Sequence, residues 1–127
     1  MRKWIEPFIV APIATERAED EIIYYYDARG QLLAEVYHHD GQFCSGTFYD
    51  EGKRALITKE QAIDIAEHVK HVLQQEHLQF QDIQRDEDGY LVEFRRVEPV
   101  YGLIVQGCGL FVTISDTGFV ANVTLHE

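Results

Sequence analysis

The sequence predicts an α+β fold, in which a curled antiparallel sheet packs against one long amphipathic helix at about residues 58–77. Three observations support this fold class. Asp-Gly turn signals recur at short intervals along the 127-residue chain. The runs between them are rich in Ile, Val, Tyr, Phe and Thr, which favour strands. One segment breaks this rhythm with apolar residues at helical spacing.

The N-terminal part, residues 1–56, is predicted to be a meander of strands. Its predicted strands are EIIYYYD (21–27), QLLAEVYHH (31–39) and QFCSGTFYD (42–50), and its turn signals are DARG (27–30), HDG (39–41) and DEGK (50–53). A polar stretch at Glu16 to Glu21 leads into the first strand. A second polar stretch, at Asp50 to Arg54, separates this meander from the C-terminal part, residues 57–127.

The helix is predicted from Thr58 to about His77. Its apolar stripe consists of Ala62, Ile65, Ala66, Val69, Val72 and Leu73. Thr58 and Gln61 stand at the spacing of a capping box, in which each side chain accepts a hydrogen bond from the backbone of the other residue. An amphipathic helix must bury its stripe, so we expect it to lie across the sheet.

Three further strands are predicted after the helix. They are GYLVEFRRV (89–97), GLFVTIS (109–115) and FVANVTLH (119–126), with turns at 86–89 and 115–118. In the first of them Tyr90, Val92 and Phe94 alternate with Glu93 and Arg95. One buried and one wet face is the pattern of an antiparallel sheet.

The length of 127 residues and the hydrophobic content of 46% predict one domain, residues 1–127. A formal net charge of −11 repels phosphate backbones and anionic lipid, so neither nucleic acid nor a membrane is expected as a partner. Glu6, Pro7 and Pro12 interrupt the first apolar run. We therefore expect a cytoplasmic protein in which Cys44 and Cys108 are thiols.

From Ile57 onward the pattern resembles the PepSY-type domain, in particular the repeats of YcdB/YcdC-like bacterial proteins. ITKEQAIDIAEHV is similar to that family's opening helix, LFVTISDTGFVANVT to its final strand, turn and strand, and GYLVEFRRVEPVYGLIVQGCGL to its middle strands. Residues 57–126 carry the resemblance, and residues 1–56 have no clear match. It implies a PepSY- or cystatin-like fold and a non-enzymatic module associated with inhibition or regulation of peptidases. It implies no catalytic residues.

The stretch GLIVQGCGL, residues 102–110, contains three glycines and Cys108. A phosphate-binding loop requires a helix after the glycines, whereas a strand is predicted here. We interpret the glycines as a bulge, a turn or a close backbone approach. Cys108 would act as a nucleophile only beside a base. The local sequence supplies none, and a histidine brought near by the fold is the alternative that stays open.

Asp64, His68 and His71 stand at i, i+4 and i+7 on the polar face of the predicted helix. Side chains at this spacing can converge on a metal ion. The favoured interpretation is a solvated face on which Asp64 pairs with His68 and Glu67 with His71. No metal site and no cofactor are predicted.

Five tyrosines form the predicted interaction surface: Tyr24, Tyr25, Tyr26, Tyr37 and Tyr49. The first three are consecutive in a predicted strand, so their rings must go to both faces of the sheet. Tyrosine is enriched at protein contacts, because its ring buries apolar area while its hydroxyl keeps a partner. A thick aromatic core is the alternative.

We expect a non-enzymatic binding or regulatory module that acts through protein–protein contacts, because no catalytic motif is assembled in the sequence. The partner would be another protein or a second copy in a homodimer. The first alternative is a small-ligand binder or hydrolase in the mouth of a curved sheet that uses His38, His39 and Cys108. The second is an acidic inhibitor of a basic partner.

Overall fold

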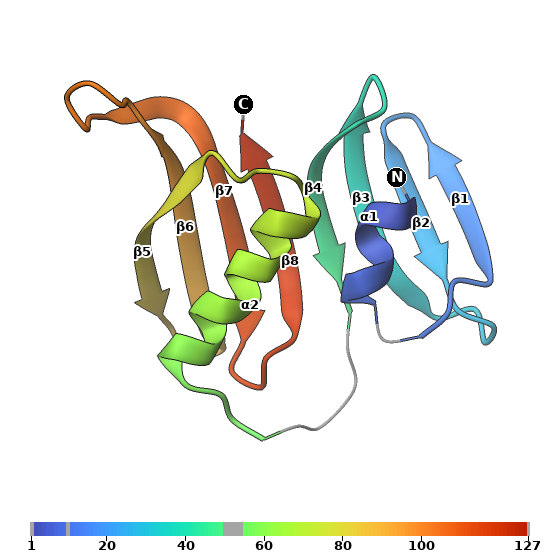
Figure 1. The fold of residues 1–127 in the computed structure, drawn as a ribbon. Helices are drawn as coiled ribbons and strands as arrows, with labels where there is room; N and C mark the ends of the chain where they lie inside the picture. The colour runs from blue at the N-terminus through green and yellow to red at the C-terminus, as the bar shows by residue number, and fades with distance from the viewer. Residues whose placement is uncertain (1, 10, 50–54, 127) are drawn as a thin grey trace.

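Eight strands of the described chain form one antiparallel sheet, and each half of the chain supplies four of them. The computed structural model describes residues 2–9, 11–49 and 55–126. Along the sheet the strands follow the order β1-β2-β3-β4-β8-β7-β6-β5 (Figure 1). Two meanders therefore lie side by side and meet at β4 and β8.

The two halves have the same order of elements. The N-terminal half contains α1 (Arg2–Ile5), the 3₁₀ helix η1 (Glu6–Phe8), β1 (Thr15–Glu19), β2 (Ile22–Tyr26), β3 (Leu32–His39) and β4 (Gln42–Phe48). The C-terminal half contains α2 (Lys59–Val72), β5 (Leu78–Arg85), β6 (Gly89–Val97), β7 (Ile104–Ser115) and β8 (Val120–His126). In each half a helical segment precedes a four-stranded meander.

The β4–β8 junction is short. Its paired residues are Ser45 with Thr124, Gly46 with Val123, and Thr47 with Asn122. On one face the Nδ2 of Asn122 donates a hydrogen bond to the Oγ1 of Thr47 at 2.9 Å. On the other face Gly46 leaves room for two rings, since a Cβ there would lie 3.2 Å from Phe48 and 3.3 Å from Phe43. The backbone ladder is thus supported by a polar contact on one side and aromatic packing on the other.

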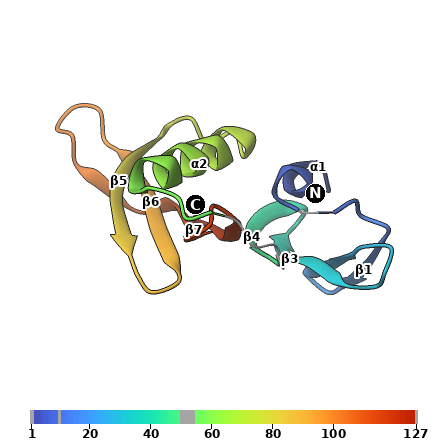
Figure 2. The same cartoon turned by 90° about the horizontal axis from the view of Figure 1, so that it is seen from below.

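Both helical segments cover the same face of the sheet (Figures 1 and 2). Phe8 of η1 packs edge-on against Phe48 of β4, with ring centroids 5.5 Å apart. The buried side chains of α2 are Ala62, Ala66 and Val69, and α2 contacts β6 and β7. The main hydrophobic core therefore lies between the helices and the sheet. The opposite face, which no described helix covers, is called the open face below (Figure 2).

The predicted α+β fold with a long helix over about 58–77 is wrong. The described chain is predominantly antiparallel sheet, and α2 is a short helix of 14 residues that ends at Val72. The N-terminal end of the helix is confirmed. Thr58 and Gln61 form the capping box, with Oγ1 of Thr58 accepting from the Gln61 N–H at 3.2 Å and Oε1 of Gln61 accepting from the Thr58 N–H at 2.8 Å.

The helix ends early because the chain turns at Gln74. Gln74 has a φ of +58°, and its N–H donates to the carbonyl of His71, while the N–H of Gln75 donates to the carbonyl of Lys70. These two bonds are a Schellman motif, which satisfies the last helical carbonyls. Glycine usually occupies the left-handed position of this motif. A glutamine there gives no stop signal in the sequence.

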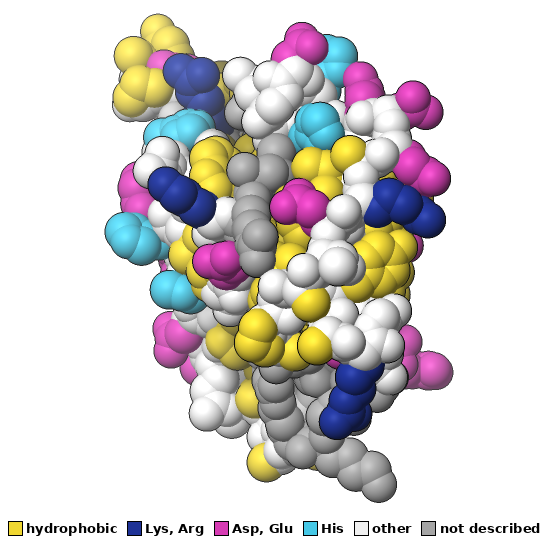
Figure 3. Space-filling view, turned by 90° about the vertical axis from the view of Figure 1, so that its right-hand side faces the viewer, with side chains coloured by type: hydrophobic (Ala, Val, Ile, Leu, Met, Phe, Trp, Pro, Cys, Tyr) yellow, Lys and Arg dark blue, Asp and Glu magenta, His cyan; other side chains and the backbone are white. Residues whose placement is uncertain are grey.

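Two strands were not predicted, and both lie at the edges of the sheet. β1 overlaps the polar stretch at Glu16 to Glu21, and all five of its residues are exposed. β5 starts at Leu78, directly after the end of the predicted helix. Figure 3 shows the side of the molecule on which β1 lies, where exposed hydrophobic side chains lie among acidic and basic ones. Charged residues on an edge strand hinder pairing with other chains. They also replace the alternation of apolar and polar residues from which a strand is predicted.

Cys44 and Cys108 are free thiols, as predicted. The predicted turn at 50–53 and the polar stretch at Asp50 to Arg54 lie outside the described residues. Within the described chain, no helix has both the length and the apolar character needed to cross a membrane.

A substitution at Gly89 tests how closely the backbones of β6 and β7 approach each other. A methyl group at Gly89 would overlap the backbone carbonyl oxygen of Ile114, so the two strands must separate in Gly89→Ala. We expect a loss of about 2–3 kcal/mol in the free energy of unfolding, measured by urea denaturation.

Gly41→Ala is the matched control. Gly41 has a φ of +78° and open space around its Cβ position, so only backbone strain of about 1 kcal/mol is expected. Equal losses in the two variants would contradict the close approach at Gly89.

Candidate functional site

The turn between β6 and β7 presents a group of exposed apolar side chains. Val100 is 75% exposed, Tyr101 81%, Leu103 64% and Ile104 48%. We call these four residues the apolar tip. They are half of the eight large hydrophobic residues that are exposed in the described chain. Figures 1 and 2 show that this turn projects beyond the sheet and curves toward the side that carries the helices.

The backbone of the tip is held by Glu98. The carboxylate of Glu98 accepts hydrogen bonds from the N–H groups of Val100 and Tyr101, both at 2.7 Å. The N–H of Glu98 donates to the carbonyl of Leu103 at 2.7 Å, and Gly102 N–H donates to the carbonyl of Glu98 at 2.9 Å. Gly102 has a φ of +69°, which its lack of a Cβ permits. The apolar side chains thus stand on an ordered turn.

The sequence did not predict this site, because the family resemblance assigned the whole stretch GYLVEFRRVEPVYGLIVQGCGL to middle strands. The signal is present in Glu98-Pro99-Val100-Tyr101-Gly102, where proline and glycine mark a turn whose central residues are apolar. Exposed turns usually consist of polar residues, so apolar residues at this place indicate a contact surface.

The structure divides the five predicted surface tyrosines between the two faces of the sheet. Tyr25 is completely buried in the core, so it forms no part of an interaction surface. Tyr24 alternates with it and lies on the open face, where its ring is 4.9 Å from the guanidinium of Arg17. Tyr26 lies at a register shift between β2 and β3.

Tyr37 and Tyr49 also lie on the open face. Tyr37 follows the buried Val36 in β3, and Tyr49 follows the buried Phe48 directly after the end of β4. Desolvation raises the pKa of Tyr49. The charge of Glu35 raises this pKa further, and so does the hydrogen bond that the Tyr49 hydroxyl donates to Glu35. Glu35 pairs with Tyr24 in the ladder. Tyr24, Tyr37 and Tyr49 are thus placed together with an acidic residue on an uncovered surface.

His39 belongs to a small polar cluster near the turn between β3 and β4. Its Nδ1 lies 2.9 Å from Oε1 of Glu21, and its Nε2 lies 3.5 Å from Oδ2 of Asp40. The hydrogen bond to Glu21, together with the nearby charges of Asp40 and Glu21, raises the pKa of His39. Hydrogen bonds from Tyr37 and then from His39 lower the pKa of Glu21. The cluster links the turn before β2 to the end of β3, and its side chains are partly to largely exposed.

The three residues singled out on the helix do not form a metal site. Asp64, His68 and His71 are all exposed, and no group of three or more His, Cys, Asp or Glu side chains in the described chain is arranged to hold a metal ion. His71 Nδ1 lies 2.6 Å from Oε1 of Glu76, and Glu67 pairs with Lys70 at 2.9 Å. Glu67 and His71 therefore each pair with another residue, and not with each other as expected.

Cys108 shares a cavity with two histidines, but not with those of the alternative site. It lines a cavity of about 380 Å³ together with His77, His126 and Arg96. His38 and His39 lie on β3, which β4 and β8 separate from β7. Three strand spacings amount to roughly 14 Å. The alternative site built from His38, His39 and Cys108 is thus not brought together, and Cys108 instead shares the lining of a cavity with His77 and His126.

Comparisons with known proteins add no assignment: no protein-family model, no curated protein and no solved structure matches this chain. The resemblance to the PepSY-type domain therefore remains a prediction from residues 57–126.

Removing the carboxylate of Glu98 should release the apolar tip. In Glu98→Ala the N–H groups of Val100 and Tyr101 lose their acceptors, and we expect their amide hydrogen exchange to accelerate by tenfold or more. Glu87→Ala, at an exposed residue in the turn between β5 and β6, is the control. Unchanged exchange at the tip in Glu98→Ala would show that Glu98 does not order it.

The pKa of His39 should fall in Glu21→Gln. Because the pKa of His39 is raised on folding, its protonated ring stabilises the folded chain below the unfolded-state pKa. This contribution is lost as the pH rises through the higher folded-state pKa. An NMR titration of the histidine ring signals measures the shift, with Glu76→Gln as the control. The same His39 pKa in both variants would contradict the contact with Glu21.

Proposed function

We propose that this chain is a non-enzymatic binding module that acts through protein–protein contacts, with the apolar tip as its principal contact. One observation carries the proposal. Four consecutive or nearly consecutive large apolar residues are exposed on an ordered turn, where folding alone gives no reason for them. Large exposed apolar groups on otherwise polar proteins mark surfaces that are covered in a complex.

The tip has the composition of an interface centre. Tyrosine is among the residues that most often dominate binding energy. Burying a Val, Leu or Ile side chain on association stabilises a complex by about 1.5–3 kcal/mol each. Because Glu98 already orders the backbone, little entropy is lost when the turn docks. The matching partner surface is an apolar groove that receives a projecting turn.

Charge favours a protein over a lipid surface as the partner. The net charge of −11 opposes approach to anionic membranes. The same charge steers the molecule toward a groove with a basic rim. The resemblance to the PepSY-type domain adds peptidases to the partners that we propose to test, with the tip entering a substrate cleft.

The double variant Tyr101→Ser/Leu103→Ser tests this function. Wild-type protein captures its partner from a native lysate, the partner is identified and purified, and the affinity is measured by titration calorimetry. We expect the double variant to bind at least 100-fold more weakly, because two buried apolar anchors are lost. Leu56→Ser removes a side chain that is 72% exposed outside the tip, and we expect it to bind as the wild type does.

Equal affinity of the tip variant and the wild type would contradict the proposal. So would saturable binding of the wild type to phosphatidylcholine vesicles that disappears in the tip variant, because the tip would then be a lipid contact.

A further inference from the structure

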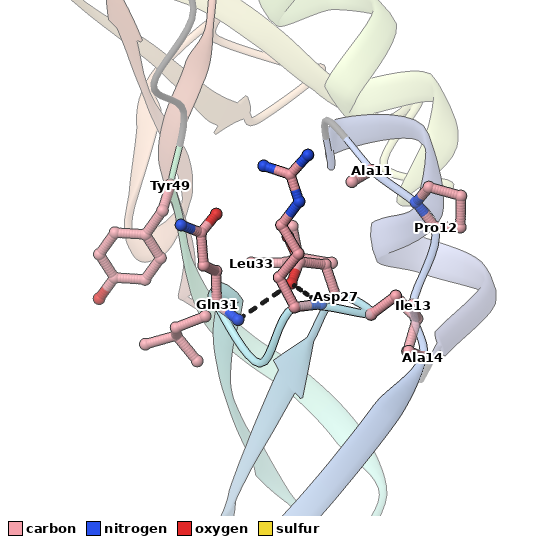
Figure 4. A pocket seen from close by; sticks show the side chains of 11 residues that line it. Ala11, Pro12, Ile13, Ala14, Asp27, Gln31, Leu33 and Tyr49 are labelled. Atoms are coloured by element: carbon pink, nitrogen blue, oxygen red, sulfur yellow. Dashed lines mark hydrogen bonds between the residues drawn. The ribbon is translucent and has the colours of Figure 1, made fainter.

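A second site, remote from the apolar tip, lies beside the turn between β2 and β3. A cavity of about 470 Å³ opens there, within the range of pockets that hold small molecules. Figure 4 shows Ala11, Pro12 and Ile13 on one side of it, Gln31 and Tyr49 on the other, and Asp27 between them. Most of the lining is apolar: Ala11, Pro12, Ile13, Ala14, Ala28, Leu32 and Leu33.

The walls of this pocket are fixed by hydrogen bonds. Oδ1 of Asp27 accepts from the N–H groups of Arg29 and Gln31, at 2.8 and 2.9 Å (Figure 4). The backbone closes the same turn, with Asp27 N–H donating to the carbonyl of Gln31 at 3.0 Å. The opposite wall is tied to β2 by a bond of 2.9 Å from Ala14 N–H to the carbonyl of Tyr26. A ligand would therefore meet a site that already has its shape.

Arg29 is the cationic residue of the lining. It forms no ion pair with a described side chain, although the chain carries twice as many acidic as basic residues. Asp27 is the acidic residue of the lining, and one of its oxygens already serves two backbone amides. The pocket thus combines apolar walls, one guanidinium available to a ligand and the side-chain amide of Gln31.

We propose that this pocket binds a small organic monocarboxylate with an apolar body. The apolar part would lie against Ile13, Leu32 and Leu33, and the carboxylate would meet the guanidinium of Arg29. A guanidinium matches a carboxylate through two parallel N–H donors, and such charge-assisted bonds are the stronger ones in proteins. The anion would lie toward Arg29 and away from Asp27, because like charges repel.

Hexanoate is the probe, titrated into ¹⁵N-labelled protein and followed by NMR. We expect saturable shifts of the backbone amides of Ala11, Ala14, Arg29 and Gln31. Hexan-1-ol carries the same chain without the charge, and acetate carries the charge without the chain. Both should bind at least tenfold more weakly than hexanoate, because each lacks one of the two interactions that the site offers.

Two variants assign the interaction to this pocket. Arg29→Gln should weaken hexanoate binding at least tenfold, whereas Arg17→Gln, at an exposed arginine of β1, should leave it unchanged. Ala28→Trp places a large ring in the pocket and should abolish the shifts while the remaining spectrum is preserved.

Three results would overturn the proposal. The first is hexanoate shifts that do not saturate or that lie elsewhere in the chain. The second is equal affinity for hexanoate and hexan-1-ol, which would remove the carboxylate from the assignment. The third is an equal loss of hexanoate affinity in Arg29→Gln and Arg17→Gln, which would indicate a general effect of the protein's charge. None of these results bears on the apolar tip, so the two proposals stand or fall separately.

Discussion

The pairing of β4 with β8 is the constraint on which the rest of the structure depends. Three residue pairs turn two separate meanders into one eight-stranded sheet. The pairing is antiparallel and joins the fourth strand of each half, so the halves are related by an approximate two-fold axis perpendicular to the sheet. Both helical segments must then lie on one face (Figure 2). The uncovered open face, with Tyr24, Tyr37 and Tyr49, is the other result of the same pairing.

The same relation places corresponding turns at opposite ends of the molecule. The turn between β2 and β3 and the turn between β6 and β7 are each held by a carboxylate that accepts two backbone N–H groups, from Asp27 in the first and Glu98 in the second. Their surroundings differ. The segment of residues 11–14 closes a pocket beside the first turn, whereas the second turn projects with apolar side chains. One architecture thus presents a concave site at one end and a convex site at the other.

Local chemistry made part of this structure predictable. The capping box of Thr58 and Gln61 and the alternating interior strands could be predicted because each depends on residues close in sequence. The end of α2 could not be predicted, since Gln74 adopts a left-handed conformation that usually requires glycine. β1 and β5 escaped prediction because edge strands bury too little to need alternation. The apolar tip and the neighbours of Cys108 depend on strand order, which composition does not reveal.

The β4–β8 junction also bears on how the chain assembles. All other strand pairs in the described chain join consecutive strands, whereas Thr47 and Asn122 are 75 residues apart. β4 therefore leaves the ribosome long before β8 has been synthesised. In that interval the hydrogen-bonding edge of β4 has no native partner. Phe43 and Phe48 are the large apolar side chains of β4 beside this unpaired edge. Nascent chains would consequently be vulnerable to cross-pairing through β4, and exchange of β8 between two copies is the form of misassembly that this topology invites.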